Sequence, residues 1–186
     1  MPFPIAHGMI GASIVAASRK NVSLSRDWQS LLMGAALANC PDFDFFFVWV
    51  LDLSDTWHRG FSHSITFAVI AGLIASALAG RPRLKDILVY GAAAMSHSLL
   101  DALSSRMSPG VQLFWPFSSD YYRSGLFEYV DMYLTRYPWQ EFLVGAIKVS
   151  LIEAVVFAPL LLLTLFINRS RQPSEFGSPA RETAGD

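Results

Sequence analysis

The chain has 186 residues, of which 53% are hydrophobic and only 16% carry a charge. About a quarter of the residues in soluble domains are charged, so this composition favours an integral membrane protein. The net charge of −1 argues against the basic face of a nucleic-acid-binding protein, and the single cysteine, Cys40, excludes an internal disulfide and a cysteine-rich zinc module.

Apolar segments predict about five helices, at residues 5–17, 28–51, 64–79, 84–103 and 142–167. Pro41 lacks a backbone donor and predicts a break inside the second segment. We expect an all-α, polytopic membrane bundle of about five embedded helices in residues 1–168, followed by a disordered cytoplasmic tail, 169–186. Because only the last segment is a long, clean span, one membrane anchor beside a buried helical bundle is the alternative.

Basic residues alternate with these segments. Nine of the fourteen lie in three connecting or terminal stretches: Arg19, Lys20, Arg26, Arg81, Arg83, Lys85, Arg169, Arg171 and Arg181. Positive charge collects on the cytoplasmic side of membrane proteins. The pattern therefore predicts a multi-pass protein of the inner (cell) membrane, with its N-terminus outside and its C-terminus in the cytoplasm.

This topology brings the histidines and several aspartates to one level, near the outer face of the bilayer. Ionisable residues inside membrane segments are costly, and they indicate function by default. The predicted metal ligands are His7, Asp42, Asp44, His58, His63, His97 and Asp101. His97 and Asp101 are four residues apart, so a helix places both on one face. A helix-stabilising contact explains that pair equally well, and a solvated kink is the alternative for the two aspartates after Pro41.

Residues 58–64 are the most informative stretch. Gly60 permits a tight bend between His58 and His63, and Ser62 is a candidate cap for the helix that follows. Arg59 is a candidate phosphate clamp, because a guanidinium matches phosphate geometry, although a lipid-headgroup anchor is as good an explanation.

Imidazole and carboxylate ligands predict a divalent metal cofactor, with zinc expected and manganese or iron as alternatives. Seven candidate ligands are enough for one or two ions. Asp42, Asp44 and Arg59 are the predicted catalytic residues, with one aspartate as a bridge or general base.

The stretch from residue 114 to residue 139 is rich in aromatic side chains, which suits a segment lying on the outer leaflet or, equally, a cap on the helix bundle. It is a candidate site for a lipid headgroup. The predicted substrate-binding residues are Arg59, Arg106, Arg123 and Trp115.

The motifs His7, Pro41-Asp42-Phe43-Asp44, residues 58–64, residues 96–101 and Phe114-Trp115-Pro116 resemble those of the YdjM-type family of membrane-bound metal-dependent hydrolases. The resemblance implies the seven metal ligands above. That family is similar, more distantly, to zinc-dependent phospholipase C, which implies a helical fold and phosphoester hydrolysis. This chain has one His-x-x-x-acid helix pair where the phospholipases have two, so a three-metal centre is not expected.

The expected function is metal-dependent hydrolysis of a phosphoester in a lipid or lipid-linked substrate, with water activated by the metal. Membrane lipid is the expected partner, and nucleic acid is not. The alternatives are a non-catalytic metal-binding scaffold or sensor and a transporter. A transporter needs polar residues through the inner half of the bilayer, and Lys148 and Glu153 are exceptions in otherwise apolar segments.

Overall fold

The computed structural model describes residues 3–54, 57–80, 82–104, 110–126 and 138–170. The regular secondary structure in this part of the chain is helical, apart from an isolated β-bridge between Val111 and Tyr122. Its elements are α1 (Pro4–Ser18), α2 (Leu24–Asn39), η1 (Cys40–Asp44), α3 (Phe45–Trp49), η3 (Phe61–His63), α4 (Ile65–Leu78), α5 (Leu84–Ser104) and α6 (Trp139–Ser170), where η marks a 3₁₀ turn. All five predicted segments fall on helices, and the all-α prediction is confirmed.

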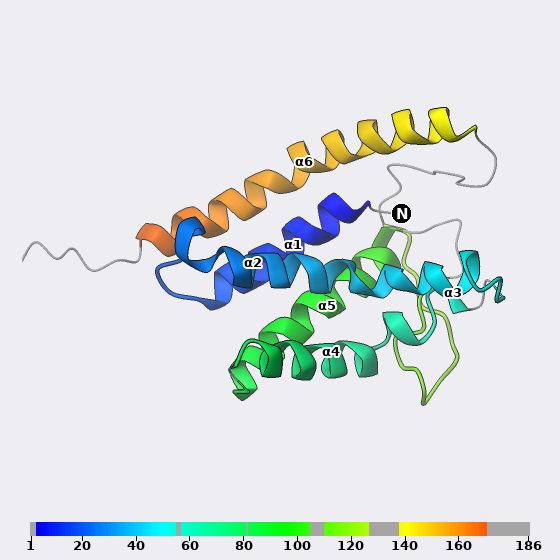
Figure 1. Ribbon diagram of the computed structural model, residues 1–186, viewed down its shortest axis with the longest axis horizontal. Coiled ribbons are helices and arrows are strands. Elements are labelled where there is room, and N and C mark those ends of the chain that lie inside the picture. The colour runs from blue at the N-terminus through cyan, green and yellow to red at the C-terminus, as the bar shows by residue number, and fades with distance from the viewer. Residues whose placement is uncertain (1–2, 55–56, 81, 105–109, 127–137, 171–186) are drawn as a thin grey trace, which may run out of the picture.

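The helices run back and forth between two ends of the bundle (Figure 1). Helix α1 lies against α2, α5 and α6, and α4 pairs with α5. One end, called here the site end, holds the starts of α1 and α4 and the ends of α2 and α5. The other, the basic end, holds the α1–α2 connection, the start of α5 and the end of α6. The basic residues Arg19, Lys20, Arg26, Arg83, Lys85 and Arg169 belong to the basic end.

Small residues fill the contacts between helices, and large apolar residues face outward. Gly11 of α1 meets Gly34 of α2 so closely that a Cβ on either glycine would overlap the other's carbonyl group, and Gly72 meets the backbone of α5 in the same way. Outside, Leu73 and Ile74 of α4 and Val155 of α6 are about half exposed or more. This arrangement is typical of helices that pack together in lipid.

Two stretches of the described chain, Leu24–Val48 and Leu143–Arg169, are long and apolar enough to cross a membrane, whereas α1 and α4 are apolar but shorter. The predicted helical fold is confirmed, but only two membrane spans are supported, and embedding of about five helices stays a prediction.

The predicted break at Pro41 is confirmed, because α2 ends at Asn39 and the 3₁₀ turn η1 follows. The predicted tail begins within α6, which continues through Ser170; its remaining residues, 171–186, lie outside the described part of the chain.

Candidate metal centre

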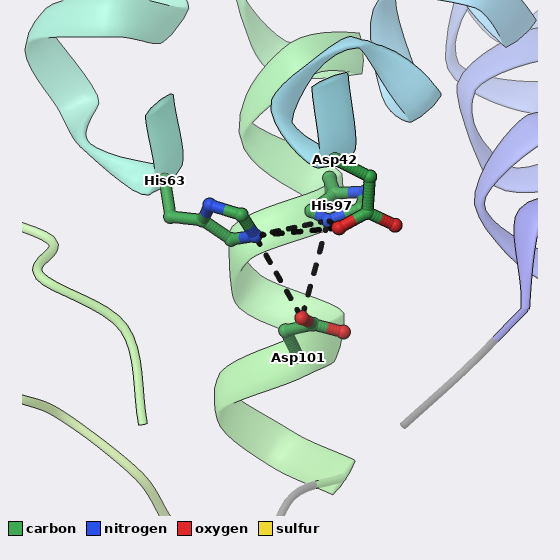
Figure 2. Close-up of side chains that lie close together, drawn as sticks. All are labelled: Asp42, His63, His97 and Asp101. Carbon is green, nitrogen blue, oxygen red and sulfur yellow. Dashed lines mark hydrogen bonds and ion pairs between the residues drawn. The ribbon is translucent and has the colours of Figure 1, made fainter. Parts of the chain in front are cut away.

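Four side chains from three separate elements meet at the site end (Figure 2). Asp42 comes from η1, His63 from η3, and both His97 and Asp101 from α5. One ligand atom from each lies within 4.8 Å of the corresponding atoms of the others. His63, His97 and Asp101 are completely buried, whereas the Asp42 side chain is 19% exposed.

The spacing of these atoms suits a small divalent ion. His97 Nε2 lies 3.2 Å from Asp42 Oδ1 and 3.2 Å from His63 Nε2, and Asp101 Oδ2 lies 3.8 Å from His63 Nε2 and 3.9 Å from His97 Nε2. In a tetrahedral zinc site with bonds near 2.0–2.1 Å, neighbouring ligand atoms lie about 3.3 Å apart. The four side chains need little movement to hold such an ion.

The hydrogen bonds around His63 fix its proton on Nδ1. Ser62 Oγ donates its one hydrogen to Asp44 Oδ2 at 2.6 Å, so at its 3.0 Å contact with His63 Nδ1 the hydroxyl accepts. Asp44 Oδ2 also lies 3.3 Å from this nitrogen. Burial keeps the pKa of His63 below its ordinary value and favours the neutral ring. The Nε2 lone pair of His63 therefore points into the cluster.

His97 is oriented in the same way by its backbone partner. Its Nδ1 donates to the carbonyl of Ala38 at 2.7 Å, which leaves the Nε2 lone pair directed at the cluster. The lone pairs of His63 Nε2 and His97 Nε2 then point at each other and at the carboxylates of Asp42 and Asp101. No hydrogen lies between the two nitrogens unless one of the buried rings takes a second proton. A bound cation would remove the repulsion between these electron pairs. Hydrogen-bond partners that orient the ring from outside, as here, are typical of metal-binding histidines.

His7 extends the cluster on the side of α1. Its ring stacks on His97 with 3.9 Å between centroids, and its Nε2 lies 3.6 Å from Asp101 Oδ1. The side chain is completely buried, and neither ring nitrogen has a hydrogen-bond partner among the described residues. A buried imidazole without such a partner is costly, so His7 fits as a further ligand to an ion near Asp101.

Asp44 joins η1 to the loop that carries two of the histidines. Besides Ser62 Oγ, it accepts from His58 Nδ1 at 2.8 Å and from the backbone N–H of Arg59 at 3.0 Å. Asp44, His58 and Asp42 also form a second group of side chains close enough to hold an ion. The number of ions, one or two, stays a prediction, whereas the hydrogen bonds of Asp44 show that it orients the loop.

The predicted bend between His58 and His63 is present at residues 58–60, where Gly60 has φ of −83° and ψ of −121°, and Arg59 beside it adopts the left-handed conformation with φ of 66°. One local prediction in this loop is wrong. Ser64, and not Ser62, caps α4 by accepting from the N–H of Phe67 at 3.1 Å. The hydroxyl of Ser62 serves Asp44 instead, as described above.

The predicted substrate-binding residues lie in different environments. Arg59 is buried, and its guanidinium lies 3.4 Å from Asp101 Oδ2. Trp115 is partly exposed and packs on Phe61, with 5.9 Å between ring centroids. Arg123 is exposed, and Arg106 lies outside the described residues.

Glu153 has a role that the sequence did not reveal. This completely buried side chain of α6 accepts hydrogen bonds from the backbone N–H groups of Phe3 and Ala6, at the start of α1. A carboxylate is favourable at a helix N-terminus, where backbone donors lack helical partners. The contact fixes α6 to the helix turn that carries His7. The sequence feature that could have indicated this role is the presence of a single acidic residue inside the apolar segment 142–167.

A comparison with known protein families gives one match. The model of the YdjM inner membrane protein family matches residues 1–172. Neither the curated proteins nor the solved structures include a match. With buried His and Asp side chains placed to hold a metal ion and two candidate spans, the chain belongs to the YdjM inner membrane protein family.

Proposed function

We propose that this protein is a membrane-bound, metal-dependent hydrolase that cleaves a phosphoester of a lipid or lipid-linked substrate. The observation that carries the proposal is the convergence of His63 Nε2, His97 Nε2 and the carboxylates of Asp42 and Asp101, with both imidazoles oriented by partners outside the cluster. A divalent ion, expected to be zinc, supplies an acidic water and polarises a phosphoryl oxygen when bound.

The residues of the site divide the remaining tasks. His63, His97 and Asp101 would hold the ion from completely buried positions, whereas Asp42, the fourth side chain of the cluster, is partly exposed. Asp42 is therefore the best-placed carboxylate to take a proton from water. Arg59 neutralises Asp101 from 3.4 Å and limits repulsion between the acids.

Apolar grooves beside the cluster support a lipid substrate. One, of about 360 Å³, is bordered by Asp44 and by phenylalanines that include Phe43, Phe46 and Phe47. A second, of about 220 Å³, is lined by residues that include Trp57, Phe61 and Trp115. Aromatic walls next to a polar centre suit a molecule with an acyl chain and a phosphate headgroup.

The proposed placement is a multi-pass protein whose site end faces the extracytoplasmic side. The interior of small residues and the exterior of large apolar residues support embedding of the whole bundle. The basic residues at the opposite end support a cytoplasmic position for that end.

One observation favours a second candidate, a metal-binding scaffold or sensor. Four protein ligands with little exposure resemble a structural zinc site, because catalytic zinc keeps an open position. In a hydrolase, one of the two carboxylates would have to leave its ligand position so that water or substrate can bind. Asp42 is the carboxylate with access to solvent.

The test measures bound metal and turnover on the same purified, full-length protein. We expect about one or two equivalents of metal and cleavage of a generic phosphodiester after addition of zinc or manganese. His97→Ala should abolish turnover, and Asp101→Ala should abolish metal binding, because each removes a buried ligand.

Asp86→Ala is the matched control, since Asp86 lies on the same helix about 22 Å from Asp101. It should retain both properties. Turnover that survives His97→Ala and a chelator would refute the hydrolase, whereas stoichiometric metal without turnover on any phosphoester would establish the scaffold.

A further inference from the structure

A groove of about 800 Å³ lies at the basic end of the bundle, away from the metal centre. It is lined by residues of the α1–α2 connection, the first turn of α2 and the last two turns of α6. Figure 1 shows the end of α6 at the same end of the bundle as the α1–α2 connection. Helix α2 begins at this groove and leads into η1 at the metal centre, so its 16 residues separate the two by about 24 Å.

The groove combines two arginines with an apolar wall. Arg26 comes from α2 and Arg169 from α6, and the apolar wall includes Leu162, Leu165 and Phe166. Both arginines are exposed. A guanidinium has five N–H donors, and Arg26 uses three of them in hydrogen bonds to Asp27 and to the carbonyl of Asn21. Donors therefore remain on Arg26 for an incoming anion.

Positive charge exceeds negative charge around the groove. Asp27 lies between Arg19 and Arg26 and compensates part of their charge. Lys20 and Arg169 add two further cations. The N-terminus of α2, which carries a partial positive charge, also opens on the groove. The combined chemistry selects an anion.

The membrane placement proposed above, on which this step rests, puts the groove at the level of the lipid headgroups. Of the two candidate spans, one begins at Leu24 and the other ends at Arg169, and both residues line the groove. Two spans that end together define the same membrane surface. Phe166 and Leu162 then face the acyl region, and the arginines lie where phosphates are found.

From this arrangement we propose that the groove binds one anionic phospholipid. The phosphate lies between Arg26 and Arg169, and an acyl chain lies along Leu162, Leu165 and Phe166 of α6. Basic pockets between membrane helices recognise acidic headgroups in this way. The site is separate from the metal centre, so metal content is unaffected by its loss.

The experiment titrates phosphatidylglycerol, and separately phosphatidylcholine, into the full-length protein in a non-ionic detergent, with bound lipid counted by native mass spectrometry. Only phosphatidylglycerol should remain bound. Arg26→Gln should weaken its binding about fivefold, and Arg26→Gln combined with Arg169→Gln about 30-fold. Arg83→Gln is the matched control, an exposed arginine at the same end that is absent from the groove, and should change binding less than about twofold.

Soluble glycerol 3-phosphate distinguishes a lipid site from a phosphate site. It should fail to displace the lipid at millimolar concentration, because it lacks the acyl chain that α6 contacts. Displacement by it, equal binding of phosphatidylcholine by the wild-type protein, or an equal effect of Arg83→Gln would each overturn the proposal. Metal content and thermal unfolding of every variant verify that it is folded.

Discussion

The site end and the middle of the bundle are held together in different ways. At the site end, segments distant in the sequence meet through buried polar groups, as in the contacts of Asp44 with residues 58–63 and of Glu153 with the start of α1. In the middle, α1 meets α2 and α4 meets α5 through glycine and alanine, with backbone against backbone.

The difference follows from the solvent that each region excludes. With the bundle placed in the membrane as proposed, apolar side chains gain little by leaving the surrounding lipid, so the middle of the bundle depends on close van der Waals contact. The site end contains charges that neither lipid nor protein tolerates unpaired, and it depends on complementary polar partners. The two regions should therefore respond to different perturbations.

The largest effect is expected on removal of the ion. Metal at a free concentration 1,000 times its dissociation constant stabilises a folded protein by about 4 kcal/mol. A chelator should therefore lower the thermal unfolding temperature of the detergent-solubilised protein markedly. Asp101→Ala protein, which lacks a ligand, should already unfold at the lower temperature and should not respond. A wild-type protein indifferent to the chelator would show that the polar contacts suffice without an ion.

A middle-sized effect is expected from Gly11→Ala. The added Cβ would overlap the Gly34 carbonyl and lie 2.6 Å from Ala38 Cβ, so α1 and α2 must separate. Overpacking of this kind costs about 1–3 kcal/mol. Gly8→Ala is the control on the same helix, because its Cβ meets only the Asn39 side chain closely, at 3.2 Å. Equal unfolding temperatures for the two variants would contradict the close helix contact.

The smallest effect is expected from Glu153→Gln. The amide keeps the size of the carboxylate, but it loses the charge and has one acceptor oxygen in place of two, so only one of the N–H groups of Phe3 and Ala6 keeps its acceptor. A loss of about 1 kcal/mol in the free energy of unfolding is expected. Glu141→Gln changes an exposed acid in the first turn of the same helix, where solvent screens its charge, and it should lower stability less than Glu153→Gln. Chemical denaturation in detergent measures the free energy of unfolding of both variants. An unchanged free energy of unfolding for Glu153→Gln would mean that the charge contributes nothing.

The helices and the convergence of ligands were accessible from the sequence. Runs of apolar residues have to form helices in lipid, where the backbone must satisfy itself, and Pro41 had to interrupt one. The alternation of basic connections then placed His7, His63 and His97 at one level. The structure confirms that these three lie together.

Details set by packing were not accessible. The choice of Arg59 for the left-handed position and of Ser64 for the helix cap depends on how the loop wraps around Asp44. Glu153 required knowledge that α6 returns to the start of α1, more than 140 residues earlier in the chain. Neither periodicity nor local propensity contains such long-range information.

The bonds made by Asp44 also link two of the four clustered side chains to each other. Asp44 follows Asp42 by two residues in η1, and its hydrogen bonds with the Arg59 N–H and Ser62 Oγ hold the loop that carries His63. One carboxylate outside the cluster thereby sets the spacing between two of its members that are 21 residues apart in the sequence. A substitution of Asp44 should therefore displace Asp42 and His63 together, although it removes neither of them.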